Sequence, residues 1–518
     1  MIDKELELQS IFNTEIAKND QLITNSERYA ALTLPSEFLR DETRDYEEVE
    51  HDYQSIGGVA VSNLANKIMN TLFDTRHPFF RAEYSKEQKQ ELMTGVNADG
   101  EQVSTPISED QILKASAQAE KEAIKGLQKR SSRTVLTDTV LQLIITGNAL
   151  LRIPEDESKN YQMYTMRNYI VKRDAFGEFK LIIVCIEKQV KLLDDKLKEK
   201  ALANKFKEDD KVKIYTGIKK VGQNEFKVWQ EMENVCVCHE EKGTRTQDEI
   251  EYIPLTWKLA TGRDYGTGLV EMHRGVLEEM SIATQTLIDQ MAILSDIKYL
   301  VNPSGMTDVR QLAQSRAGSY VQGREQDIAI LQANNVNAIQ GILANIDRLK
   351  REIGTIFLLN SAVTRDAERV TAQEIRLQAQ ELEAGLGGVY SRLGADLQLP
   401  IAKRLLRDVN PIFSKVEPTI ISGVEGLSRG ADQQKINAMM QDLAAMANVP
   451  EQVLEFIDMA GLIATLGANY GVDYSTFLKD EKAVQEARRI AAEQQAMAAG
   501  QQKAMEGVGQ NMAQPPQQ

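Results

Sequence analysis

The chain has 518 residues, of which 42% are hydrophobic and 6% are aromatic. This length and composition predict about three or four packed units with mainly aliphatic cores. The formal net charge of -15 argues against a protein that binds nucleic acid over its whole surface, although it leaves local basic sites open.

The three cysteines, Cys185, Cys236 and Cys238, are too few and too scattered for a disulfide framework, which indicates a reducing compartment. Cys236, Cys238 and His239 bring three soft metal ligands close together in sequence. A tetrahedral zinc site needs a second ligand pair, and the other histidines are distant in sequence. We therefore expect an ordinary strand at this position, with no metal and no cofactor.

The sequence contains no apolar run of the roughly eighteen residues that a membrane-spanning helix requires. Residues 1–6 are too acidic and polar for a secretion signal. We therefore expect a protein that stays in the cytoplasm where it is made, or leaves it inside a larger particle.

The first part of the chain predicts a mixture of helices and strands. Apolar residues recur at helical spacing in several segments, and a short run of aromatic residues predicts a strand at 79–84. The predicted helices cover residues 3–30, 58–73, 107–129 and 133–145, and the last of them should be buried and should end at Gly147.

From about residue 149 to residue 256 the pattern is mostly that of β-strands, interrupted by a charged helical segment at 191–206. Asp174 to Gly177 predict a hairpin turn. The alternating charges of 191–206 favour a solvated helix over a nucleic-acid patch. After a strand beginning at Ala149, the strand candidates are 161–171, 178–186, 211–217, 226–232 and 234–239.

Two long helices organise the middle of the chain. Residues 269–296 and 336–359 each carry one apolar stripe with a 3.6-residue period. The roughly forty residues between them predict a small α/β unit, with a turn at 301–305 and short strands at 320–321 and 328–331. We expect a projecting helical hairpin with this unit at its tip.

A loop with two arginines, at 360–370, precedes a third long helix, which opens with a capping box formed by Thr371 and Glu374. Four glycines fall inside that helix. Each costs ~1 kcal/mol relative to alanine, so we expect a close backbone approach or a bend. Pro400 should kink or end the helix near Leu397. The four glycines are Gly385, Gly387, Gly388 and Gly394.

Sequence motifs give an enzymatic function little support. There is no phosphate-binding loop, no His-Glu-x-x-His and no Gly-x-Ser-x-Gly. Gly266 and Gly268 lack the third glycine of a dinucleotide fingerprint, because position 271 is Glu. Carboxylate pairs could still escape a search by spacing.

Nine short stretches, in the same order along the chain, resemble the portal proteins, the head–tail connectors of short-tailed double-stranded DNA phages. The resemblance spans roughly residues 5–480 and is weakest at 191–206 and beyond residue 481. The stretches are SNLANKIM (62–69), GNALL (147–151), KRDAFG (172–177), YG (265–266), LVNP (300–303), LNSAV (359–363), ERVTA (368–372), GGVYS (387–391) and EPTI (417–420).

The resemblance implies a mainly helical α+β fold, assembled as a dodecameric ring at one capsid vertex, with genomic DNA passing through its channel. It also implies a division of the chain into regions. These are a wing (1–268), a first stem helix (269–296), a clip (297–335), a second stem helix (336–359), a channel loop (360–370), a long kinked helix (371–410), a helical crown (411–499) and a disordered Gln/Met-rich tail (500–518).

The resemblance also implies partners. We expect the terminase large subunit during packaging, major capsid and scaffolding proteins, tail adaptor or tail tube proteins, and possible internal core proteins at the crown, but no membrane. The protein would be assembled in the host cytoplasm and located in the virion at the head–tail junction.

Charge and apolar pattern suggest the residues that would carry this function. Arg365 and Arg369 in the channel loop are the candidates for DNA contact, and Lys350 and Arg351 are weaker ones. Asp366 and Glu368 beside the loop arginines would keep such contacts weak, which suits sliding DNA. Two alternatives remain open: the loop residues bind each other or the next subunit, and Lys350 and Arg351 keep the helix surface soluble. The candidates for the subunit interface in the stem are Leu287, Met291, Ile342 and Ile346.

Two other classes of function remain open. An internal scaffolding or structural helical protein without a DNA channel would be almost purely helical, which the strand-rich middle opposes. A packaging ATPase would turn over ATP, which the missing phosphate-binding loop opposes. An intrachain bundle of the hairpin with the C-terminal helices is the alternative to a ring.

Overall fold

The structure is a computed structural model of the chain. It describes residues 8–38, 52–73, 79–84, 109–129, 132–156, 158–233, 245–295, 298–316, 318–331, 336–359, 380–409, 417–420 and 441. The chain divides into two compact units, Met1–Gly426 and Leu427–Gln518. Apart from residue 441, the description that follows concerns the first unit alone.

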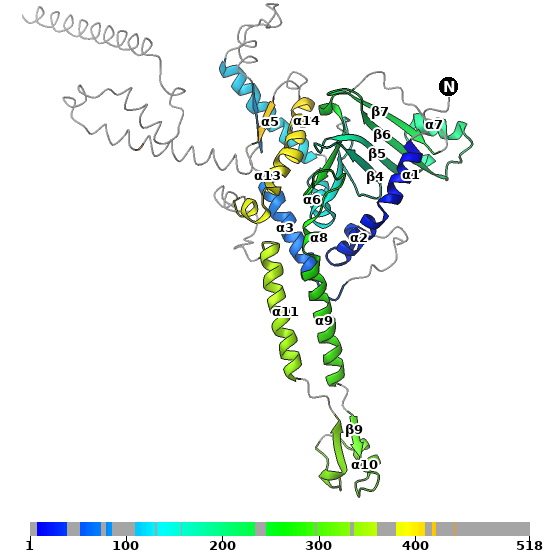
Figure 1. Cartoon of the computed structure of the whole chain (residues 1–518), viewed down its shortest axis with the longest axis vertical. Helices are drawn as coiled ribbons and strands as arrows, with labels where there is room; N and C mark the ends of the chain where they lie inside the picture. Colours follow the sequence, from blue (N-terminus) through cyan, green and yellow to red (C-terminus); the bar gives the residue numbers. More distant parts are fainter. Residues whose placement is uncertain are drawn as a thin grey trace, which may run out of the picture. The chain divides into compact units, whose positions relative to one another are not determined.

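Helices and antiparallel sheets both build this unit, with helices in the majority, as the sequence predicted (Figure 1). The α-helices are α1 (Leu8–Lys18), α2 (Asp20–Ala31), α3 (Ile56–Leu72), α5 (Glu109–Lys129), α6 (Ser132–Thr146), α7 (Asp195–Ala203), α8 (Leu269–Met272), α9 (Arg274–Ser295), α10 (Val309–Gln314), α11 (Val336–Ile356), α13 (Val389–Leu393) and α14 (Leu399–Val409). The strands are β1 (Phe80–Glu83), β2 (Asn148–Arg152), β3 (Gln162–Tyr164), β4 (Tyr169–Arg173), β5 (Phe179–Gln189), β6 (Lys211–Lys220), β7 (Phe226–Met232), β8 (Tyr252–Thr256), β9 (Lys298–Val301), β10 (Ile328–Leu331) and β11 (Glu417–Ile420).

The largest sheet has the strand order β4-β5-β6-β7, with every pair antiparallel. Its two faces pack against different clusters because successive strand residues point to opposite sides. On one face Leu8 and Phe12 of α1 pack on Ile170, Ile183 and Tyr215. The predicted hairpin turn joins β4 to β5, and Gly177 adopts φ +87° there.

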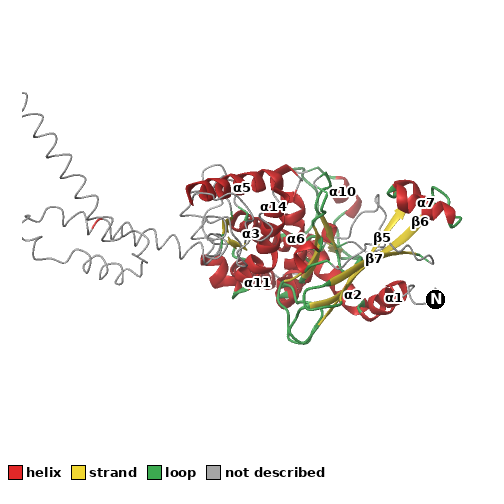
Figure 2. Cartoon of the chain, turned by 90° about the horizontal axis from the view of Figure 1, so that it is seen from above, coloured by secondary structure: helices red, strands yellow, loops and turns green. Residues whose placement is uncertain are grey.

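The buried helix α6 leads directly into β2, the central strand of the sheet β3-β2-β8. Gly147 forms the junction with φ +79°, and a Cβ there would lie 2.3 Å from the backbone nitrogen of Gly268. The sequence predicted a helix end at Gly147, and the structure adds the reason: two backbone segments cross at this point. Helix α6 packs beside α3 and α5 (Figure 2).

The helical hairpin of the middle region is present as α9 and α11, which pack against each other (Figure 1). Its first helix is interrupted at His273, so that α8 is a separate single turn. Strands β9 and β10 pair antiparallel between the two long helices, and α10 completes the small α/β unit. The predicted strand at 320–321 is wrong, because these residues have no strand partner and Tyr320 is fully exposed.

The predicted long helix over 371–410 is not continuous where the structure describes it. Gly387 and Gly388 have φ of +59° and +85°, so they form a turn rather than lie inside a helix. A π-helical segment at Gly394–Gln398 then leads into α14, with Pro400 in its first turn. Pro400 lacks the amide that a continuous α-helix would use, which accounts for the interruption expected near Leu397.

One part of the predicted helical crown (411–499) is instead a strand. Residues 417–420 form β11, which pairs antiparallel with β1 at Phe80 to Glu83. This pairing joins segments that are far apart in sequence. The local spacing of apolar residues cannot predict such a pairing. The helical prediction is therefore wrong for these four residues.

Several predictions lie outside the described residues. They are the strand at 234–239 with Cys236, Cys238 and His239, the loop at 360–370 with Arg365 and Arg369, the capping box of Thr371 and Glu374, and the crown and tail from 421 onward except residue 441. Within the described residues no helix is long and apolar enough to cross a membrane, and no group of acidic, His or Cys side chains could hold a metal ion.

Candidate assembly and DNA-contact surfaces

The interior of the α9–α11 pair is formed by the apolar stripes of both helices. Leu349 and Ile353 of α11 and Leu277 of α9 are completely buried, as is Phe357 just after α11, and Met280 of α9 is 4% exposed. A single chain therefore covers a large part of these stripes by itself.

Polar contacts hold the register of the same pair. Arg348 of α11 lies 2.9 Å from the Glu279 carboxylate of α9 and 2.9 Å from Glu352. Asn345 donates a 3.2 Å hydrogen bond to Glu279. These contacts are exposed, so each contributes little stability, but together they orient one helix against the other.

Two apolar side chains, Ile282 and Ile293, lie on a face of α9 that the chain's described residues leave largely uncovered. Ile282 is 63% exposed and Ile293 is 50% exposed, and they lie about three helical turns apart on the same face. Ile288 and Met291 are also more than half exposed, but they lie on the side of α9 that carries Leu277 and Met280. An exposed apolar patch of this kind marks an interaction surface.

The predicted interface residues fall into three groups. Met291 is exposed, as an interface residue should be, and Leu287 and Ile342 are partly buried. Ile346 is only 6% exposed within the single chain, so its side chain offers little surface to another subunit. Ile282, Ile288 and Ile293 were missed because they lie off the stripe that the 3.6-residue period selected.

The weaker DNA-contact candidates lie side by side on α11. Lys350 is exposed and makes no hydrogen bond or ion pair with any described residue. Arg351 is exposed and its Nε donates to the backbone oxygen of Asp347 at 3.2 Å. Both positive charges therefore remain available to an external anion.

The C-terminal end of α11, just before the undescribed segment from residue 360, is held by a contact that the sequence did not reveal. Leu358 adopts φ +54°, and its carbonyl accepts a hydrogen bond from Lys67 of α3. Burial lowers the pKa of Lys67. A Cβ on Gly385 would lie 2.9 Å from Leu358 Cδ2, so this glycine permits close packing against the same residue.

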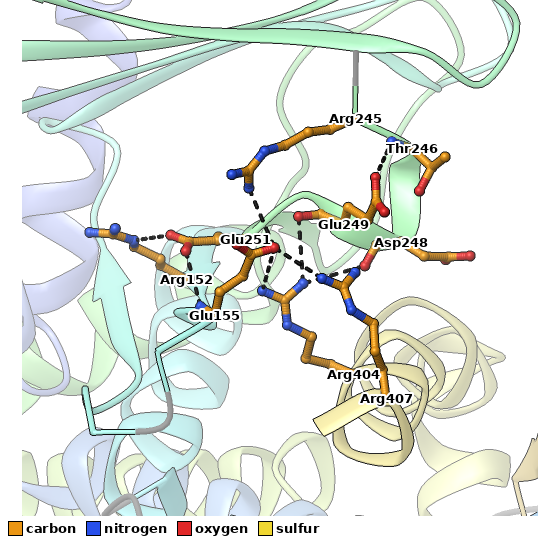
Figure 3. Close-up of polar contacts among 9 residues, drawn as sticks. All are labelled: Arg152, Glu155, Arg245, Thr246, Asp248, Glu249, Glu251, Arg404 and Arg407. Carbon is orange, nitrogen blue, oxygen red and sulfur yellow. Dashed lines mark hydrogen bonds and ion pairs between the residues drawn. The ribbon is translucent and has the colours of Figure 1, made fainter. Parts of the chain in front are cut away.

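A network of ion pairs connects α14 to the β-strand region (Figure 3). The Glu155 carboxylate lies 3.0 Å from Arg407, 3.6 Å from Arg245 and 3.8 Å from Arg404. Beside it, Glu251 accepts from the Glu155 backbone amide and pairs with Arg152 at 2.8 Å. Burial alone would raise the pKa of Glu251, but these contacts lower it below its ordinary value.

Comparison with known proteins gives these surfaces a context. Residues 7–478 match the family described as bacteriophage head to tail connecting protein. The chain belongs to this family. It is therefore a structural component of a phage particle, placed at the junction of head and tail, and its function is that of a phage portal.

Curated relatives agree over nearly the whole length. The chain is 31% identical to the portal protein of Enterobacteria phage SP6 over 95% of this chain and 94% of the relative. It is 30% identical to the portal protein of Escherichia phage T7, over 96% and 92%, and to that of Pseudomonas phage phiKMV, over 93% and 94%. A chain from the neck of an empty gene transfer agent particle, at 10% identity, matches 80% of this chain and 90% of its own length with a TM-score of 0.38.

The head-to-tail connecting family and the four-stranded sheet together argue against an internal scaffolding protein that is almost purely helical. The resemblance found in the sequence is thus confirmed, and so are the fold class and the general function.

Proposed function

We propose that the chain forms a closed dodecameric ring at one vertex of the capsid, and that genomic double-stranded DNA passes through its central channel during packaging and ejection. The observation that supports this most directly is the exposed isoleucine face of α9. A patch that its own subunit leaves uncovered needs a neighbour, and head-to-tail contacts that close into a ring cover it on every subunit.

The regions take their roles from this arrangement. The α9–α11 pair is the stem, and the unit of β9, β10 and α10 is the clip, which faces outward toward the terminase large subunit and later the tail proteins. Met306 is 77% exposed and Tyr320 is fully exposed in that unit, as expected of a docking surface. The wing is the mixed region before residue 269, which would contact major capsid and scaffolding proteins, while the crown from 411 onward faces the head interior.

DNA in the channel must slide, so its contacts must be weak and independent of sequence. Arg365 and Arg369, repeated around the ring, would touch the phosphate backbone, while Asp366 and Glu368 reduce their field. A pair of unit charges exposed to water is worth only ~1 kcal/mol at 4 Å, which permits movement. Lys350 and Arg351 on α11 would add a second level of weak contacts.

Electron microscopy of the purified protein tests the ring directly. We expect closed rings with a central hole wide enough for a DNA duplex, and a sedimentation coefficient that stays at the oligomer value on dilution into the micromolar range. A well-folded monomer at high protein concentration would contradict the proposal, because it would show that the α9 face needs no second copy.

A further inference from the structure

The cap at the C-terminal end of α11 has a defined hydrogen-bond pattern. The amide of Leu359 donates to the backbone oxygen of Gly354 at 2.7 Å, and the amide of Leu358 donates to that of Thr355 at 3.3 Å. These two bonds form a Schellman motif, in which the residue at the place of Leu358 adopts a left-handed backbone conformation. Leu358 has φ +54°, in agreement with this motif.

A leucine at this place carries strain that a glycine would avoid. Its Cβ disfavours the left-handed conformation, which is why glycine or asparagine usually occupies this position of the motif. Among the described residues other than glycine, only Lys205 shares a positive φ with Leu358. A strained conformation of this kind persists only where the surrounding contacts hold it, so the neighbours of Leu358 should account for it.

Two contacts from other segments hold Leu358. The ammonium group of Lys67, on α3, donates to the Leu358 carbonyl, and its positive charge lies at the end of α11 where the helix dipole favours a cation. A Cβ on Gly385 would lie 2.9 Å from Leu358 Cδ2, so the missing side chain at 385 leaves room for the leucine. Both the backbone and the side chain of Leu358 are therefore fixed from outside α11.

The surroundings of Lys67 join three parts of the chain. Helix α3 packs against the stem helix α11 (Figure 1). Burial lowers the pKa of Lys67, and the charge of Glu381 acts in the opposite direction. Glu381 and Gly385 both belong to the helical residues 380–386. The wing, the end of the stem and the segment that follows the proposed channel loop thus meet at Leu358.

We propose that Lys67 is a positioning residue of the portal. By holding the Leu358 carbonyl, it keeps the cap in its left-handed form and fixes the direction in which the chain leaves the stem toward residues 360–370. The inference rests on the proposed function, in which that loop contacts DNA. Lys67 acts through Leu358 and does not itself contact DNA.

The strain at Leu358 separates this role from a merely structural one. Glycine at position 358 would remove the strain, because glycine adopts a positive φ freely. Loss of the Lys67 ammonium should therefore matter when residue 358 is leucine and hardly matter when it is glycine. A lysine that served only the packing of α3 would have the same effect in both cases.

Amide hydrogen exchange of the full chain tests the cap, with mass spectrometry of peptic peptides that cover residues 355–359. We expect Lys67→Met to speed exchange there about tenfold, because a hydrogen bond from a charged group is lost. In chains that carry Leu358→Gly, adding Lys67→Met should change this exchange less than about twofold. Lys125→Met, at an exposed position of α5, is the matched control and should exchange as the unchanged chain does.

The consequence for DNA is measured in assembled particles. We expect Lys67→Met to leave rings visible by electron microscopy and to cause a loss of nuclease-protected DNA per particle. When Leu358→Gly is present, adding Lys67→Met should cause no further loss. Peptides from the middle of α11, at 343–349, should exchange equally in all variants, which distinguishes a change at the cap from general loosening of the subunit.

Unchanged or slower exchange at residues 355–359 in Lys67→Met would overturn the proposal, as would an equal increase with leucine and with glycine at 358. Normal DNA retention despite faster exchange would also overturn it, because the cap would then position nothing on which DNA depends. Failure of the unchanged chain to form rings would instead contradict the proposed function, and the exchange measurement would still decide whether Lys67 holds the cap.

Discussion

Single residues in this protein hold backbone segments together where no regular element does so. Gly147 lets the α6–β2 junction cross residues 267 and 268, and Asn148 then exchanges hydrogen bonds with Gly266, accepting one of 2.7 Å and donating one of 2.9 Å. Lys67 holds the end of α11 in the same manner, through the carbonyl of Leu358. Each contact depends on one side chain, or on the absence of one.

Gly147→Ala should therefore be severely destabilising. The new methyl group would lie 2.3 Å from a backbone nitrogen, and the residue would have to keep φ +79°. We expect a loss of about 3 kcal/mol or more in the free energy of unfolding, or no soluble protein. Urea unfolding followed by circular dichroism measures it.

The matched control is Gly126→Ala. Gly126 lies inside α5, and a Cβ there meets nothing within 4 Å. Alanine should stabilise this helix by up to about 1 kcal/mol. If both substitutions had the same effect, the crossing at Gly147 would not be the constraint that the structure indicates.

Glu37 provides a pH-dependent prediction at the same scale. Burial, and then the nearby Asp138 carboxylate, raise the pKa of Glu37, and burial raises the pKa of Asp138. A raised folded-state pKa means that stability falls as pH rises from the ordinary carboxyl range through the folded pKa, and stays lower above it. Glu37→Gln removes this loss, so it should stabilise the protein at pH 7.

The gain from Glu37→Gln should shrink at pH 5, where more of the natural carboxyl is already protonated. Glu199→Gln, at an exposed position of α7, is the control and should change stability little at either pH. Unfolding free energies measured at both pH values check the sign. A gain that increases on acidification would show that Glu37 is not held in a desolvated site.

Among the elements, α9 and α11 combine two surfaces with different roles. The face between them is buried within one chain, whereas Ile282 and Ile293 remain exposed on the opposite side of α9. The first face should therefore govern the stability of the subunit, and the second its assembly. Substitutions can separate the two.

Ile282→Asn with Ile293→Asn should leave the subunit folded, changing its stability by about 0.5 kcal/mol or less at each site. It should nevertheless prevent or strongly weaken ring formation, because the uncovered face would become polar. Analytical ultracentrifugation measures the change in oligomeric state.

Leu349→Ala is the contrasting variant. Leu349 of α11 is completely buried, so its truncation should cost about 2–5 kcal/mol in subunit stability. If the asparagine variant assembled normally while Leu349→Ala abolished assembly without loss of stability, the assignment of the two faces would be reversed.

At the scale of the whole molecule, the main question is how a chain with net charge -15 handles DNA. An acidic assembly repels phosphates in general, so contact must depend on a few local cations. Arg365 and Arg369 are the proposed pair, and the acidic residues beside them limit the strength of each contact.

Arg365→Ala with Arg369→Ala should leave ring assembly intact but change DNA packaging or retention. Electron microscopy verifies the rings, and the amount of nuclease-protected DNA per particle measures packaging. Lys188→Gln, at an exposed position of β5, is the control. Unchanged packaging and retention in the double variant would remove this loop from the mechanism.

Much of the fold could be predicted from sequence, and the errors have clear physical causes. Helices with a long apolar period were placed to within a few residues, as for α5 and α11, because that pattern is local. The helix expected to run through Gly387 and Gly388 failed because the positive φ at both positions is set by the turn they form. The strand β11 was missed because its partner, β1, is more than three hundred residues away.

For the candidate surfaces, too, some features follow from the sequence and others only from the tertiary structure. Short collinear motifs were enough to indicate the family, and helical periodicity was enough to predict the α9–α11 hairpin. The sequence also shows no recognisable catalytic motif. All of these patterns depend on residues that are close together in the sequence. Only the tertiary structure decided that Ile346 is covered and Ile282 is not, that Lys67 holds Leu358, and that Arg404 is buried within reach of Glu155. Those facts depend on which distant segments meet, and burial and charge compensation exist only once they have met.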